Sequence, residues 1–92
     1  MLYIMERIEF ADSAFRHGFD EQDFVEMLSR RYVKLSSQRG LAHVFEILGQ
    51  NLAADYLHVV YRLLGNGKTI QVFHINKMTA RQKRRFKRMI KR

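Results

Sequence analysis

The sequence contains no cysteine, no proline and no tryptophan. Without cysteine, the chain cannot be a disulfide-stapled scaffold and cannot build a thiolate metal site. It has no run of about 18 apolar residues and no apolar segment typical of a signal peptide, so neither a membrane span nor secretion is expected. We therefore expect one small cytoplasmic domain over residues 1–92, in which residues 1–4 are a possible N-terminal extension.

Acidic residues are missing from the last part of the chain. Residues 80–92 carry eight Lys or Arg and no Asp or Glu, whereas the other residues carry nine basic and nine acidic groups, so the net charge of +8 lies in this segment. One interpretation is the solvated face of a terminal helix. We favour contact with nucleic acid, because each cation that neutralises a phosphate releases a counterion. The candidate RNA-binding residues are Arg81, Lys83, Arg84, Arg85 and Arg88.

Capping residues predict where the helices begin. Residues 11–18 are typical of a short helical segment that ends at Gly18. A second helix is expected to begin after Asp20, a good N-cap, and to end near Arg31. A last helix is expected after Thr79, because Gln82 stands at the spacing of a capping box.

Alternating apolar residues predict strands in the remaining segments. These segments are 1–10, 32–37, 41–49, 56–64 and 68–75. Helices that precede an antiparallel sheet, with a terminal basic helix after it, indicate an α+β fold of two layers.

Asn66-Gly67 predicts a tight hairpin between the last two strands. A two-residue loop places three pairs on one face: Leu63 with Ile70, Tyr61 with Val72, and Val59 with His74. On the other face it places Arg62 with Gln71, Val60 with Phe73, and His58 with Ile75. A three-residue loop would instead pair His58 with His74. We favour the first register, because it separates apolar from polar side chains better.

The four histidines do not form a metal motif. No two of them have the i, i+4 spacing of a zinc site, and no nucleophile or phosphate-loop motif accompanies them, so we expect no metal and no cofactor. A nuclease with this sequence would therefore be metal-independent, with basic groups stabilising charge on the scissile phosphate. His74 is expected to be a core residue, whereas His58, on the same strand face as Arg62, suits proton transfer.

Three segments of the chain resemble a known family. MERIEFADS, RHGFDEQDFVEML and LHVVYRLLGNGKTIQVFHINKMTARQKRRF are similar to the BrnT-like toxins of the RelE ribonuclease superfamily. The resemblance implies N-terminal helices packed on a curved antiparallel sheet of about four strands, followed by a basic C-terminal helix. It also implies that the protein cleaves cellular RNA as the toxin of a toxin–antitoxin pair, and that a cognate antitoxin binds and blocks it.

The resemblance also indicates catalytic candidates. The closing polar segment of the family falls on residues 75–79, where Asn76 replaces an expected arginine and Lys77 follows it. Arg62 would stabilise charge on the cleaved phosphate, and His43 or His58 would carry the proton. The alternative is a non-catalytic RNA-binding module that keeps the fold and has lost the catalytic residues.

Overall fold

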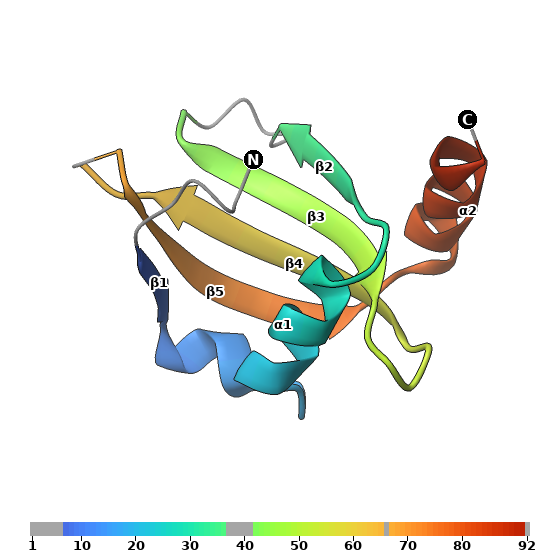
Figure 1. Cartoon of the computed structure of the whole chain (residues 1–92), viewed down its shortest axis with the longest axis horizontal. Helices are drawn as coiled ribbons and strands as arrows, with labels where there is room; N and C mark the ends of the chain where they lie inside the picture. Colours follow the sequence, from blue (N-terminus) through green and yellow to red (C-terminus); the bar gives the residue numbers. More distant parts are fainter. Residues whose placement is uncertain (1–6, 37–41, 66, 92) are drawn as a thin grey trace.

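The computed structural model of the chain describes residues 7–36, 42–65 and 67–91. In this part the chain forms five strands, one 3-10 helix and two α-helices (Figure 1). In chain order they are β1 (Arg7–Phe10), η2 (Asp12–Phe15), α1 (Glu21–Leu28), β2 (Val33–Ser36), β3 (Val44–Gln50), β4 (Tyr56–Leu63), β5 (Thr69–Lys77) and α2 (Ala80–Ile90). The proposed extension at residues 1–4 and the turn residue Asn66 lie outside the described residues.

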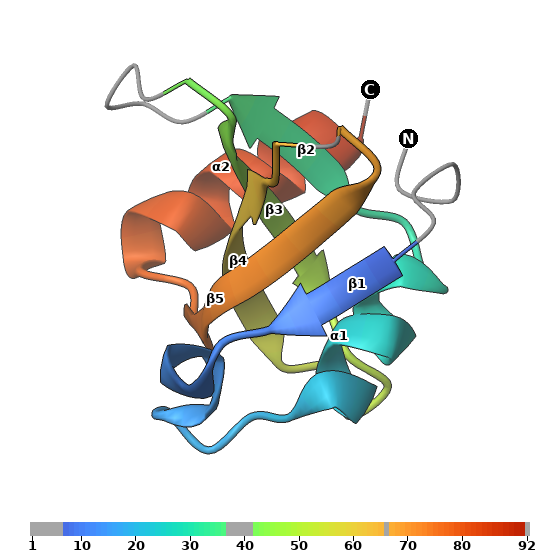
Figure 2. The same ribbon diagram turned by 90° about the vertical axis from the view of Figure 1, so that its left-hand side faces the viewer.

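The strands form one mixed sheet in the order β1-β5-β4-β3-β2. The α+β class is confirmed. The expectation of about four antiparallel strands is wrong, because β1 adds a fifth strand that pairs in parallel with β5. It pairs only with Thr69–Val72, and η2 lies against the second half of β5 (Figure 2). There the hydroxyl of Ser13 donates to the carbonyl of Phe73 at 2.8 Å, so η2 protects an edge that would otherwise be open.

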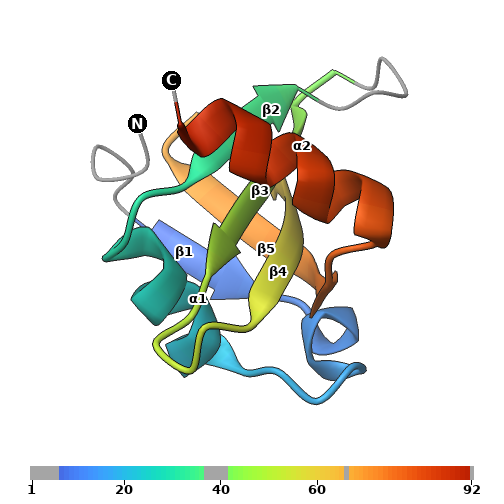
Figure 3. The ribbon, with the colours of Figure 1, turned by 90° about the vertical axis from the view of Figure 1, so that its right-hand side faces the viewer.

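Both faces of the sheet are covered, one by each α-helix. Ile47 and Leu48 are neighbours on β3 and are both buried, but successive strand residues point to opposite faces. Ile47 packs with Phe24 of α1, whereas Leu48 packs with Phe86 of α2. Figures 2 and 3, which view the molecule from opposite sides, show α2 on the face that is turned away from α1. The expected two-layer arrangement is therefore wrong, because the apolar stripe of α2 has its own cluster on the second face.

The β4–β5 register follows the predicted hairpin only near the turn. Leu63, Arg62 and Tyr61 have the predicted partners, and then the register shifts by one residue, so that Val60 pairs with His74 and Val59 with Ile75. Phe73 is the extra residue of this β-bulge. The shift has a physical reason: the uninterrupted register would have put His74 opposite buried Val59, and the bulge puts buried Ile75 there instead.

Local capping chemistry fixes the helix starts as expected. The side chain of Asp20 accepts from the amide of Asp23 at 3.1 Å, and Thr79 accepts from the amide of Gln82 at the same distance. Both pairs are reciprocal capping boxes. The helix α1 ends at Leu28, earlier than predicted, and the guanidinium of nearby Arg30 donates to a carbonyl of the β3–β4 connection at 2.8 Å.

Asn51 holds the β3–β4 connection against α1. It is 2% exposed, and its amide nitrogen donates to Asp23 at 3.0 Å and to Asp55 at 3.1 Å. Buried polar groups are stable only when their hydrogen bonds are satisfied, so this loop has one favoured geometry. These hydrogen bonds help to fix the register between β3 and β4, which makes Glu46 and His58 neighbours.

Candidate functional site

The helix α2 presents a row of arginines beside the sheet. Arg81, Arg84, Arg85 and Arg88 follow i, i+3, i+4, i+7 spacing, which places them on one helix face. They line a groove of about 690 Å³. Its other lining residues are Leu35, Glu46, Leu48, Thr79 and Gln82. Four of the five predicted RNA-binding residues therefore share one concave surface.

Lys83 lies apart from this groove. Its ammonium nitrogen is 4.8 Å from the centroid of the Tyr56 ring, and that of Lys87 is 5.3 Å from the same ring. Tyr56 belongs to the cluster under α2, so both lysines lie toward the start of β4. Lys83 contributes long-range positive potential here rather than a contact within the groove.

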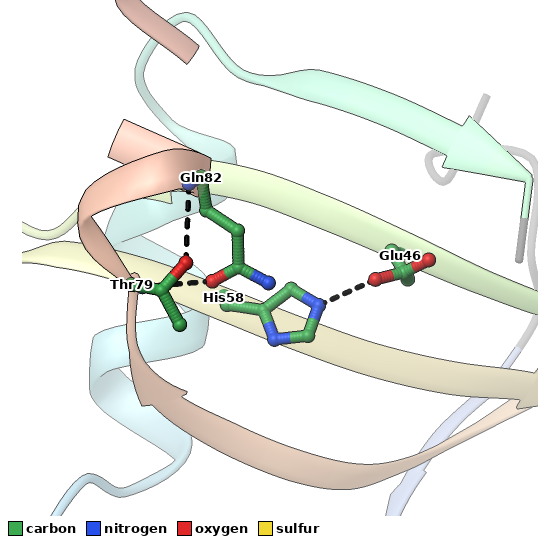
Figure 4. A network of polar contacts seen from close by, with 4 residues as sticks. All are labelled: Glu46, His58, Thr79 and Gln82. Atoms are coloured by element: carbon green, nitrogen blue, oxygen red, sulfur yellow. Dashed lines mark hydrogen bonds and ion pairs between the residues drawn. The ribbon is translucent and has the colours of Figure 1, made fainter. Parts of the chain in front are cut away.

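A carboxylate and an imidazole are in hydrogen-bond contact at the groove. Nε2 of His58 lies 2.7 Å from Oε1 of Glu46, and their side chains are only 13% and 17% exposed (Figure 4). Leu48 pairs with His58 and Glu46 pairs with Val60, so the two residues are diagonal neighbours on one face. Figure 4 also shows the Thr79–Gln82 capping box beside them.

Glu46 was not among the sequence candidates. The sequence feature that could have identified it is an acidic residue inside an otherwise apolar strand, between Phe45 and Ile47. A buried or half-buried carboxylate needs a partner, so such a residue indicates a polar contact across the sheet. The partner depends on the β3–β4 register, which the sequence does not state.

Two further histidines extend from this pair. The ring of His74 lies 5.4 Å from that of His58 and 5.4 Å from that of His17, measured between centroids. Burial lowers the pKa of His74, and the neighbouring His58 and His17 lower it further. The prediction of His74 as a core residue is wrong, because the bulge turns it to the face that carries α2. The three rings and Glu46 form a continuous titratable row.

The predicted catalytic residues fall into two groups. His58 and Asn76 are direct partners across β4 and β5, and Lys77 follows, with its amide donating to the side chain of Asn76 at 2.8 Å. Arg62 lies four residues further along β4, a separation of about 13 Å at the usual rise of a strand. His43 is exposed at the same far end, with a φ of 66°, and its carbonyl accepts from the amide of Leu63. The structure therefore does not bring Arg62 and His43 to His58, although Arg62, like His58, is a diagonal neighbour of Glu46 across the β3–β4 pairing.

Two other kinds of chemistry find no support in the described ranges. No group of three His, Asp or Glu residues there could hold a metal ion. Burial raises the pKa of Tyr61 to about 12, with Tyr32 adding to the effect, so its hydroxyl stays protonated near neutral pH.

Comparisons with known proteins add no relative. No protein-family model, no curated protein and no solved structure gives a significant match to the chain. Within the part of the chain that the structure describes, no helix is long and apolar enough to cross a membrane.

Proposed function

We propose that the protein is a cytoplasmic, metal-independent ribonuclease that holds RNA along the arginines of α2 and cleaves it at the Glu46–His58 pair. One observation carries the proposal. A histidine and a glutamate in contact at 2.7 Å stand at a groove that four arginines line. A cationic surface beside a carboxylate and an imidazole provides both of the requirements for cleaving a phosphodiester, which are charge stabilisation and proton transfer.

The arginines supply binding and electrostatic stabilisation. Guanidinium groups donate two parallel hydrogen bonds to phosphate oxygens, and they remain charged at every working pH. If all four contact phosphates of a single strand, the logarithm of the binding constant should fall with the logarithm of salt at a slope of about −3.

The pair supplies the proton chemistry. Glu46, which lines the groove, takes the proton of a ribose 2′-hydroxyl, and the 2′-oxygen attacks the adjacent phosphorus. The bond from phosphorus to the 5′-oxygen breaks, and this oxygen takes a proton from solvent, leaving a 2′,3′-cyclic phosphate and a 5′-hydroxyl. His58 holds the carboxylate in place through Nε2. The arginines stabilise the extra negative charge on the pentacoordinate phosphate.

The test compares wild type with Glu46→Gln on RNA in the presence of a metal chelator. We expect wild type to cleave and to leave cyclic phosphate ends, and the variant to cleave about 100- to 10,000-fold more slowly, the usual contribution of a general base. RNA affinity should be retained, because the amide removes a negative charge from the groove. Glu21→Gln, an exposed change in the first turn of α1, is the matched control and should cleave normally. Equal cleavage by Glu46→Gln would refute the assignment.

A non-catalytic RNA-binding module is the second candidate. The positions of Arg62 and His43 favour this candidate. Neither residue lines the groove, so neither adds its charge at a phosphate bound there. Salt-dependent RNA binding by wild type without any cleavage would establish this candidate. In either case, an antitoxin would block RNA binding by covering the groove. An acidic segment of the antitoxin would complement the positive charge of the arginines.

A further inference from the structure

Arg62 lies over an aromatic ring at the end of the sheet away from α2. Its Cζ atom is 4.3 Å from the centroid of Phe73, within the range of a cation–π contact. Arg62 is exposed, whereas Phe73 is half-buried. The ring therefore lies against the guanidinium group, and the exposed part of Arg62 is open to a ligand.

Phe73 lies on the face of the sheet that carries Arg62. It is the unpaired residue between the Val72–Tyr61 and Val60–His74 pairs. Strand alternation from Gln71 places Phe73 on this face, and the bulge then turns His74 to the same face. The hydrogen bond from Ser13 to the carbonyl of Phe73 holds the bulge from the strand's outer edge.

A polar neighbour lies beside the guanidinium. Gln71 is the direct partner of Arg62 across the two strands and is partly exposed. Its amide has both donors and an acceptor. Beyond it, Glu9 of β1 is in register with Gln71, and its carboxylate is paired with Arg7 at 3.2 Å. Among the described residues, Arg62 forms no ion pair with an acidic side chain.

We propose that the Arg62–Phe73 pair is a stacking platform for an unpaired nucleobase, with Gln71 placed to hydrogen-bond the edge of that base. This inference rests on the proposed function and names its substrate as single-stranded RNA. Unstacked bases bind to aromatic rings and guanidinium planes, whereas bases inside a duplex are stacked on each other and cannot. The platform lies about 13 Å along β4 from His58, so a strand held at the groove would extend over the sheet to reach it.

The platform binds a base through the flat guanidinium group, whereas the groove binds phosphates through positive charge. Replacing arginine with lysine should therefore affect the two sites differently. Arg62→Lys keeps the charge and removes the plane, and Arg84→Lys makes the same change in the groove. The probes are a fluorescent single-stranded RNA oligomer and an oligomer of the same length with abasic nucleotides. We expect wild type to bind the first more tightly by roughly 5- to 100-fold, the effect of stacking one base.

Arg62→Lys should abolish most of this difference and leave the salt slope unchanged, whereas Arg84→Lys should keep the difference. Phe73→Leu, which keeps apolar bulk without a ring, should behave as Arg62→Lys does. If Arg62→Lys retains the full preference for bases, or if both oligomers bind wild type equally with a normal salt slope, the platform is wrong and the proposed function stands. If neither oligomer shows salt-dependent binding, the proposed function and the platform both fail.

Discussion

Truncating Phe86 should release α2 from the sheet without unfolding the sheet itself. Phe86 is 3% exposed and belongs to a buried cluster of three residues with Leu48 and Met78. Replacing a buried phenylalanine with alanine costs about 3–5 kcal/mol. An isolated helix of this length is marginal in water, so the remaining contacts and the cap should not hold it. The larger core on the other face does not include Phe86, so it should persist.

Hydrogen exchange of individual amides measures the effect. In Phe86→Ala, amides of α2 should exchange at least about 100-fold faster, from the lower end of that cost, and those of β4 should change much less. RNA affinity should fall as well, because the arginines would no longer be held beside Glu46. Phe15→Ala is the control, since Phe15 is 38% exposed and lies in η2. If α2 keeps its protection in Phe86→Ala, the two clusters are not independent and the reasoning is refuted.

Two further substitutions test the core and the histidine row. Gly49→Ala should destabilise the protein by about 1–3 kcal/mol in urea unfolding, because the added Cβ would lie 2.6 Å from Cγ of Met27, whereas Gly65→Ala, with nothing within 4 Å, should be nearly neutral. His74 has a lowered pKa in the folded state, so its unfolded form binds protons more readily, and stability should fall as pH drops through the ordinary range near 6.5. His74→Gln should therefore lose less melting temperature than wild type between pH 7.5 and pH 5; an equal loss would contradict this explanation.

Features that depend on neighbouring residues were predictable from the sequence. The N-caps at Asp20 and Thr79 are confirmed, because a cap needs only one side chain and an amide three residues away. The first three pairs of the β4–β5 hairpin are also confirmed, since register near a tight turn follows from the turn itself. The arginine row on α2 follows from helical spacing alone.

Features that depend on distant segments were not predictable in the same way. The parallel pairing of β1 with β5 joins residues 62 positions apart in the sequence, such as Arg7 and Thr69. The bulge at Phe73 places Ile75, and not His74, opposite buried Val59. This depends on packing in the core, so the residues of the turn do not predict it. The contact between Glu46 and His58 needs the β3–β4 register, which Asn51 helps to set from within the connecting loop.

The cations and the Glu46–His58 pair belong to different parts of the fold. The cations belong to one short helix, which a small cluster around Phe86 attaches to the sheet, whereas Glu46 and His58 lie on central strands. Substitutions in α2 should therefore change affinity and salt dependence while the titratable pair stays intact. Substitutions at Glu46 should change turnover while binding stays intact. If Glu46→Gln weakened RNA binding as strongly as the loss of an arginine does, the site would be composite, and the assignment of RNA binding to α2 and proton transfer to the sheet would be wrong.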